Sequence, residues 1–360
     1  MLWMMIALFV LLASAAAVVY MVHAVGKFSF VKKLSMGRRW LRIILAVALI
    51  MLGMAVVSVI FSFINAIVFF LHVCLFFVIY ELLFLVVPKQ RRSGFKIYWQ
   101  GVLALITSVI YIGTGVFLCY NIWQTDYTID TEKNITPVRI ALIADSHFGV
   151  TVDGERFAEY MKIIEDQNPD LLIIAGDFID DGTSREDMIR ACEALGELDL
   201  PYGVFYAYGN HDRGYYSGSI PEEELVVQME RNNVTILCDE LYEVGDLCIV
   251  GREDAQNDER AELSELLEGV DENRYIIVID HEPNDYEAES ATCADLVLSG
   301  HTHGGQLFPV TLMGKFFGND QNWGLMNIDG TDFIVTSGIS DWELYFKTGT
   351  HSEYVIIDVC

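Results

Sequence analysis

The sequence predicts an α/β domain that follows a membrane region of four helices. Charge is divided unevenly along the chain: residues 1–122 contain ten Lys or Arg and one acid, Glu81, whereas the remainder contains 13 basic and 49 acidic residues. The net charges are therefore +9 and −36, which sum to −27. Beyond residue 137, short apolar runs alternate with amphipathic stretches, a pattern typical of an α/β sheet. We place the membrane region at 1–124, a polar linker at 125–137 and the α/β domain at 138–360.

Apolar segments predict the four membrane helices. Residues 2–25 lack Lys, Arg, Asp and Glu and are long enough to cross a hydrocarbon core of about 30 Å, which takes roughly 20 helical residues. Residues 43–87 would form a single helix about twice as long as the bilayer is thick, so we expect two helices that turn near residues 62–65. The fourth runs over residues 97–123, with aromatic side chains at both ends. A cleaved signal peptide is the alternative for the first segment, although a basic start is missing.

Basic residues predict the orientation of these helices. The first connection carries Lys27, Lys32, Lys33, Arg38, Arg39 and Arg42, and the third carries Lys89, Arg91, Arg92 and Lys96. By the positive-inside rule both connections face the cytoplasm. Both termini and the acidic domain are therefore expected on the extracytoplasmic side of the cell membrane.

Two ionisable side chains, Glu81 and His72, lie inside the third predicted helix. Such groups suggest a function when they are buried in a membrane. The more ordinary interpretation is that Glu81 reaches the interface and that His72 bonds to a neighbouring helix.

The elements of the α/β domain follow from periodicity and from helix caps. We expect strands over 138–144, 171–175, 204–208, 275–279 and 296–298, and helices over 155–166, 184–198, 222–231 and 259–267. The tail, 325–359, has turns at Asp329-Gly330 and Thr348-Gly349, which predict antiparallel strands.

Metal-competent side chains follow five of the predicted strands directly. They are Asp145 and His147 in RIALIADSH, Asp177 and Asp180 in LLIIAGDFID, Asn210 and His211 in VFYAYGNHD, His281 in YIIVIDH, and His301 and His303 in LVLSGHTH. Ligands of open α/β sheets bind at the carboxyl ends of the strands, so we expect these side chains to converge. Any one motif could be a turn, a surface histidine or a hydrogen-bonded core residue, but five coinciding strand ends are hard to produce by chance.

As a set and in their order, these motifs resemble the calcineurin-like metallophosphoesterases. The matching pieces are DSH from 145, GDFID from 176, GNHD from 209, His281, and GHTHGGQ from 300. The resemblance covers roughly residues 138–359. It implies a four-layer αββα sandwich, in which two sheets pack face to face with helices outside, and the family includes membrane-anchored members.

The resemblance also implies a site for two metal ions. It assigns Asp145, His147 and His303 to one ion, Asn210, His281 and His301 to the other, and Asp177 to both. Two divalent ions about 3.5–4 Å apart repel each other, so an anionic bridge is needed, and a bridging hydroxide would attack the phosphorus. Oxygen and imidazole ligands without thiolate suit manganese, iron or zinc, and magnesium less well. With two aspartates and a hydroxide, two dications leave a local charge of about +1.

Neighbouring residues receive supporting roles from the same resemblance. His211 would stabilise the transition state or protonate the leaving oxygen, with Asp212 orienting its ring, and Asp180 would support a ligand. Ordinary turn chemistry is the alternative for both aspartates.

Gly304 and Gly305 let the backbone turn sharply and are expected to leave room for substrate. Alternate residues of an extended stretch share a face, so His301 and His303 can both point at the ions.

The connection LFPVTLMGKFFGNDQNW, residues 307–323, is unusually apolar for a loop. Its large side chains are Phe308, Leu312, Met313, Phe316, Phe317 and Trp323. It could receive a lipid chain or dip into the bilayer, with Lys315 meeting a phosphate. Packing against the domain core is the interpretation that we favour.

The function predicted from these observations is a membrane-anchored, metal-dependent phosphoric ester hydrolase. It would cleave a phosphoester or pyrophosphate bond of a lipid-linked or cell-envelope substrate, with membrane lipids as further partners and no nucleic acid. The alternative is a membrane transport or scaffold protein with a phosphoesterase-like binding domain. An inverted orientation, with the domain in the cytosol, is a third interpretation.

Overall fold

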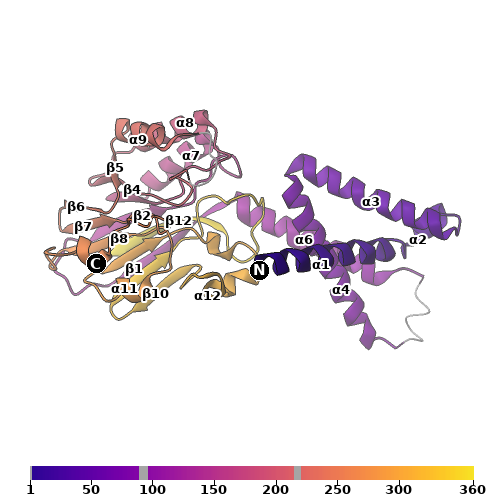
Figure 1. Cartoon of the computed structure of the whole chain (residues 1–360). Coiled ribbons are helices and arrows are strands. Elements are labelled where there is room, and N and C mark those ends of the chain that lie inside the picture. Colours follow the sequence, from indigo (N-terminus) through magenta and orange to yellow (C-terminus); the bar gives the residue numbers. More distant parts are fainter. Residues whose placement is uncertain (1, 89–95, 215–219) are drawn as a thin grey trace. The chain divides into compact units, whose positions relative to one another are not determined.

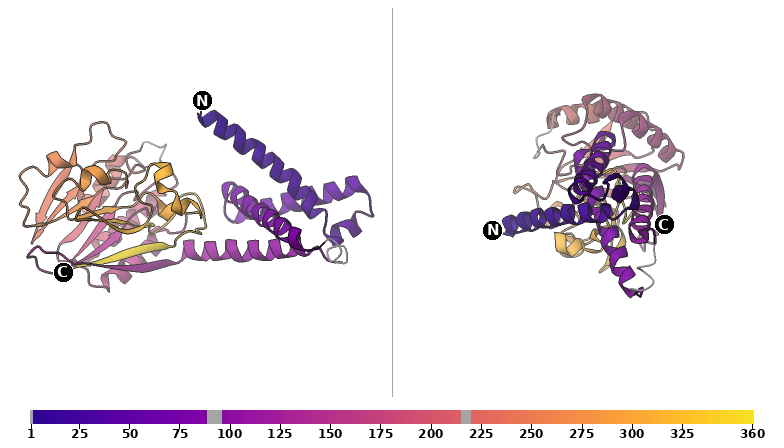
Figure 2. Two further views of the ribbon diagram at one scale, coloured as in Figure 1. Left: turned by 90° about the horizontal axis from the view of Figure 1, so that it is seen from below. Right: turned by 90° about the vertical axis from the view of Figure 1, so that its right-hand side faces the viewer.

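The computed structural model describes residues 2–88, 96–214 and 220–360, with side chains from residue 14 onward. The chain divides into two compact units, Met1–Thr114 and Gly115–Cys360. Most of their elements are labelled in Figure 1, and Figure 2 shows two further views.

The unit Met1–Thr114 is helical. Its elements are α1 (Leu2–Val25), α2 (Ser29–Leu34), α3 (Arg39–Ile60), α4 (Phe63–Leu83), η1 (Phe84–Val86) and most of α6 (Trp99–Tyr120). The predicted turn near residues 62–65 is confirmed, since Ser62 Oγ accepts a hydrogen bond from the Asn65 N–H at 3.2 Å.

Within the described residues, three helices rather than the predicted four are long and apolar enough to cross a membrane. They are Arg39–Ile60, Phe63–Val86 and Trp99–Tyr120. Helix α1 forms over Leu2–Val25, and the part of it whose side chains are described, Ser14–Val25, is a shorter apolar helix. Of the third predicted connection, Lys89, Arg91 and Arg92 lie outside the described residues.

The ionisable residues of this unit have local partners. Glu81 Oε1 accepts from Lys27 Nζ at 2.7 Å and from the Tyr98 hydroxyl at 2.5 Å. The His72 ring lies 2.8 Å from the Val68 carbonyl oxygen of its own helix and stacks on the ring of Tyr111 in α6, with the ring centroids 5.6 Å apart. These contacts support the ordinary, structural interpretation of both side chains.

The unit Gly115–Cys360 contains two six-stranded sheets in the described part of the chain. The first has the order β1 (Ile122–Ile129), β12 (Ser352–Val359), β2 (Val138–Ile143), β3 (Leu171–Ala175), β4 (Gly203–Ala207) and β5 (Val234–Leu237). The second has the order β10 (Gly324–Ile328), β11 (Thr331–Val335), β9 (Leu296–Ser299), β8 (Tyr275–Ile279), β7 (Leu247–Gly251) and β6 (Glu240–Val244). The pairs from β2 to β5 and from β11 to β7 are parallel, as is β1–β12, whereas β12–β2, β10–β11 and β6–β7 are antiparallel. The predicted α/β fold with two sheets is confirmed.

Three apolar cores arrange these elements. Along β2, Ile140 and Leu142 enter the core between the sheets, whereas Ala141 and Ile143 face the helices, as the alternation of a strand requires. Helices α7 (Gly154–Glu165), α8 (Arg185–Gly196) and α9 (Glu222–Arg231) cover the first sheet (Figure 1). The short helices α10 (Leu263–Leu266) and α11 (Tyr286–Glu289) cover the second. The central strands of both sheets, such as β3 and β8, are thus buried on both faces, which explains their continuous apolar runs in the sequence.

Strand β1 was not predicted. It takes in residues 125–129 of the predicted linker, and α6 ends at Tyr120 instead of residue 123. Strand β1 pairs in parallel with β12 from Ile122↔Ser352 to Ile129↔Val359, and Figure 2 (left) shows it continuing directly from α6. This stretch is polar because the exposed side chains of an edge strand face water.

The tail also differs from the prediction. The hairpin β10–β11 turns at Asp329-Gly330 as expected, but the turn at Thr348-Gly349 does not join two paired strands, because β12 crosses to the other sheet. The predicted helix over 259–267 is reduced to the short α10, and strands β5, β6 and β7 were missed.

Candidate metal centre

The predicted ligands meet at one edge of the two sheets. Asp145 follows β2, Asp177 follows β3 and Asn210 follows β4, while His281 and His301 follow β8 and β9. Backbone hydrogen bonds tie these loops together: Asp145 N–H donates to the Gly176 carbonyl at 3.1 Å. His301 N–H donates to Asp145 Oδ1 at 3.0 Å and so links the first sheet to the second.

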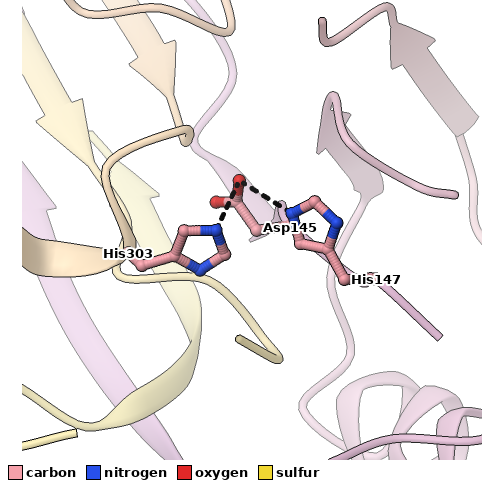
Figure 3. Close-up of side chains that lie close together, drawn as sticks. All are labelled: Asp145, His147 and His303. Carbon is pink, nitrogen blue, oxygen red and sulfur yellow. Dashed lines mark ion pairs between the residues drawn. The ribbon is translucent and has the colours of Figure 1, made fainter. Parts of the chain in front are cut away.

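Asp145, His147 and His303 form the first of two groups that could hold a metal ion in the described residues (Figure 3). One potential ligand atom from each side chain lies within 4.8 Å of the others. Nε2 of His303 is 3.9 Å and Nε2 of His147 is 4.0 Å from Asp145 Oδ1. These separations leave space for a cation among the three side chains.

Asp177, His281 and His301 form the second group. His281 Nε2 lies 3.2 Å from Asp177 Oδ2. Asn210 Oδ1 lies 3.0 Å from His301 Nδ1, which brings the predicted amide ligand to the same group.

Asp177 lies between the two groups. Its Oδ2 is 3.2 Å from His281 Nε2 and also 3.5 Å from His147 Nε2, which belongs to the first group. The structure thus places the predicted metal residues in two adjoining groups that are consistent with a dinuclear site.

The histidines are arranged as metal ligands usually are. His281 Nδ1 donates to the Ala175 carbonyl at 2.7 Å, and His147 Nδ1 lies 3.4 Å from Asp180 Oδ2, while the supporting role expected of Asp180 stays a prediction. Their Nε2 atoms are buried, make no hydrogen bond and face the carboxylates. A metal-binding histidine typically fixes one ring nitrogen in this way and offers the other to the ion. The side chains therefore fit a pair of divalent cations.

Electrostatics favour positive charge at this position. Burial raises the pKa of Asp145 to about 6, although His281 opposes the shift. Burial would also raise the pKa of Asp177, but the His281 and His147 imidazoles lower it well below its usual range. The pKa of His281 is raised well above its usual value, because the Asp177 carboxylate outweighs the effect of burial. In the protein alone, protons on imidazole thus supply charge that bound cations would otherwise provide.

The backbone of the site is strained. Positive φ angles occur at Asp145 (56°), His147 (35°), Asp177 (51°), His301 (69°) and His303 (49°). Non-glycine residues rarely adopt this region, and such residues gather at functional sites, where the surrounding structure holds them. The expected extended geometry of residues 301–303 is therefore wrong: the chain turns here and enters η2 (His303–Gly305).

The glycines of the GHTHGGQ motif allow close packing. A Cβ at Gly304 would collide with the Thr350 side chain, and one at Gly305 would lie 2.5 Å from Thr311 Cα. The expectation that these two glycines leave room for substrate is thus corrected. A Cβ at Gly300 would lie 2.7 Å from Asp145 Oδ2, so this glycine lets the end of β9 approach the metal site.

The predicted catalytic residues lie beside Asp177. His211 N–H donates to Asp177 Oδ1 at 2.9 Å, and its ring is partly exposed. The Asp212 carboxylate accepts from the N–H groups of Ile179 and Gly209 at 2.9 and 3.0 Å, and burial raises its pKa to about 7. These contacts show Asp212 joining the loops after β3 and β4, while the roles expected of His211 and Asp212 in catalysis stay predictions.

Asp341 was missed in the sequence. Its Oδ1 lies 3.6 Å from His303 Nδ1, and both side chains are buried. Trp342 beside it is exposed, with its ring 5.6 Å from the His211 ring. Both residues come after β11, which is parallel to β9 and ends at the same edge. Recognition of β11 as a parallel strand would have revealed them.

Sequence comparisons agree with this geometry. The family model for calcineurin-like phosphoesterases matches residues 138–305 of this chain. An uncharacterized metallophosphoesterase of Aquifex aeolicus is 30% identical over 59% of this chain and 81% of its own length. One from Campylobacter jejuni is 29% identical over 72% of this chain and 71% of its own. A transmembrane protein with metallophosphoesterase domain from Danio rerio is 28% identical over 71% of this chain and 61% of its own. The chain therefore belongs to the calcineurin-like phosphoesterase family.

Proposed function

We propose that this protein is a membrane-anchored phosphoesterase that needs two divalent metal ions. The observation that carries the proposal is the position of Asp177, whose Oδ2 faces His147 of one group and His281 of the other. A carboxylate oxygen so placed can neutralise two cations that would otherwise repel each other. The donor set of carboxylate, amide and imidazole favours manganese, iron or zinc over magnesium.

When bound, such ions would attract the phosphate and make water a stronger nucleophile near neutral pH. Asp145, His147 and His303 would hold one ion, and Asn210, His281 and His301 the other, with Asp177 shared. In the reaction, water adds to phosphorus and gives up a proton, the bond between phosphorus and the leaving oxygen breaks, and the leaving oxygen takes up a proton.

Other residues of this chain orient the reacting groups. Asp180 fixes the ring of His147, and the Asp177–His211 backbone contact fixes the loop that carries His211. His211 is partly exposed beside the site, so it can hold a phosphoryl oxygen or deliver the proton to the leaving group.

The proposed substrate is a phosphoester or pyrophosphate of a lipid-linked or cell-envelope compound. Three candidate membrane helices support this class, because an anchored enzyme meets phosphates in the membrane at high local concentration. We further propose that the unit Gly115–Cys360 lies outside the cytoplasm, since the basic residues between α1 and α3, and Lys96 before α6, favour the cytoplasmic face.

Hydrolysis by the full chain tests the activity. The purified protein would be stripped with a chelator, reloaded with Mn²⁺, Fe²⁺ or Zn²⁺, and assayed on generic phosphomonoesters and diesters. We expect Asp177→Asn to abolish turnover, and Asp199→Asn, which changes an exposed aspartate elsewhere, to leave it intact. Equal activity of the wild type and Asp177→Asn would favour the alternative of a transport or scaffold protein.

Labelling of Cys360 tests the orientation. Cys360 is exposed, so a membrane-impermeant maleimide should label it in intact cells if the domain is extracytoplasmic. Cys360→Ser provides the control for labelling at other cysteines. Labelling that appears only after permeabilisation would place the domain in the cytosol.

A further inference from the structure

The apolar segment 306–318 is exposed rather than packed against the core. It contains the short turns η3 (Val310–Leu312) and α12 (Gly314–Phe317). Leu312 is 76% and Phe316 78% exposed, and Phe308 and Phe317 are each more than half exposed. The interpretation favoured from the sequence, packing on the domain core, is thus wrong for these side chains. A contiguous group of large exposed apolar side chains marks an interaction surface.

The charge of this segment differs from that of the rest of the unit. Residues 303–319 contain no Asp or Glu and one cation, Lys315, whereas the chain beyond residue 122 contains 49 acids. A lipid surface with anionic headgroups would repel most of the domain but not this segment. Segments that lie in a membrane interface typically combine lysine with aromatic and other apolar side chains, as this segment does.

The segment is joined to the end of a candidate membrane helix. The Phe308 N–H donates to Thr348 Oγ1 at 3.0 Å, and the Thr348 N–H donates to the Gln306 carbonyl at 2.8 Å. The adjacent Lys347 N–H donates to the carbonyl of Gly115, in α6, at 3.0 Å. Gly115 has a neighbour in Phe346, whose Cδ2 would lie 3.0 Å from an added Cβ. The segment therefore lies close to the point where α6 enters the domain.

From these observations we infer that residues 306–318 form a membrane-seating surface that rests in the headgroup region of the bilayer crossed by α6. The side chains of Leu312, Phe316 and Phe317 enter the boundary of the acyl chains, and Lys315 meets headgroup phosphates. The occupant of this surface is the lipid itself.

This surface is continuous with the metal site. His303 lies in η2, immediately before residues 306–318, so seating of the segment holds a metal ligand close to the lipid headgroups. The consequence for substrate rests on the proposed function: the scissile phosphate would lie at headgroup depth. The lipid contact itself is independent of catalysis.

Photo-crosslinking in the full chain tests the contact. Benzoylphenylalanine would replace Phe316 in protein reconstituted into nanodiscs of phosphatidylcholine and phosphatidylglycerol, and lipid adducts would be counted by mass spectrometry. Tyr242, an exposed aromatic residue on the edge strand β6, provides the matched control position. We expect several-fold more lipid adduct at 316 than at 242, and the same result at 308 if the 316 variant folds poorly. Equal adducts at both positions, no lipid adduct, or adducts to a second copy of the chain would overturn the inference.

A second measurement separates this inference from the proposed function. In Phe316→Ser/Phe317→Ser, hydrolysis of a phosphate ester embedded in vesicles should fall several-fold, while hydrolysis of a soluble ester should be unchanged. Equal losses on both substrates would overturn the seating role. Absence of hydrolysis in the wild type would contradict the proposed function, and the crosslinking result would still stand.

Discussion

Asp341 Oδ1 lies 3.6 Å from Nδ1 of the proposed ligand His303, and neither side chain reaches solvent to any large extent. Lys347 Nζ, also buried, is 3.1 Å from the same carboxylate oxygen. The other oxygen, Oδ2, accepts from Cys119 Sγ, which belongs to the last turn of α6, at 2.9 Å. A candidate membrane helix thus contributes to the support of a metal ligand.

Asp341 is expected to act as a positioning residue for His303. In Asp341→Asn the negative charge that holds the imidazole is lost, and removal of such a partner typically costs about 10–100-fold in metal affinity. Titration of the stripped full chain with Mn²⁺ or Zn²⁺ would measure this. Asp358→Asn, which removes an exposed partner of Arg139, should leave the affinity unchanged. Equal metal affinity in both variants would show that Asp341 has only a structural role.

Cys119 is expected to act through Asp341. Cys119→Ala removes the group that donates to Asp341 Oδ2, so metal affinity should fall, but by less than in Asp341→Asn. Cys119→Ser keeps a donor and should restore most of the affinity. The buried Cys192 of α8 is the matched control, and Cys192→Ala should change stability without changing metal affinity. If Cys119→Ser binds metal as weakly as Cys119→Ala, the hydrogen bond from Cys119 to Asp341 does not support metal binding.

His211→Ala should leave metal content intact. The described contact between His211 and Asp177 uses the backbone N–H, which the substitution keeps. We expect kcat to fall by about 10²–10⁴, the range typical of a lost acid or base, with little change in bound metal. Elemental analysis beside steady-state kinetics would check both. Loss of metal would show that His211 is a ligand.

The sequence predicted those helices and strands whose bounds are determined by residues within the element itself. Helix α9 and strands β3 and β8 have the predicted bounds, because apolar periodicity and capping decide them locally. The membership of both metal groups was also predictable, since each ligand directly follows a buried strand.

Features that depend on pairing across the chain were not predictable. The polar strand β1 forms only because β12 lies beside it, more than 220 residues later. Asp341 was missed because the direction of β11 follows from its pairing with β9 rather than from its own residues. The positive φ angles of the ligands arise from the crowding of loops at one edge, which no single segment contains.

The boundary of the folded unit provides a fourth prediction. A fragment beginning at residue 126 lacks the first half of β1 and the last turn of α6, where Ser352 Oγ donates to the Cys119 carbonyl at 2.8 Å. We expect this fragment to unfold at a lower temperature than one beginning at residue 99, compared in the same detergent by circular dichroism. Equal melting temperatures would mean that α6 and the start of β1 contribute nothing to the stability of the unit.

The charge of the chain provides the last prediction. Beyond residue 122 the net charge is −36, so the field around the domain should repel small anionic substrates, even where bound cations make the site itself slightly positive. Salt screens this long-range repulsion, since the Debye length falls from about 30 Å at 0.01 M to about 8 Å at 0.15 M. We therefore expect kcat/KM for a soluble, anionic phosphate ester to rise with moderate salt. The assay needs constant metal occupancy, and an equal osmolarity of sucrose controls for solvent effects. A flat or falling profile would mean that the local charge of the metal centre, rather than that of the whole domain, governs encounter with substrate.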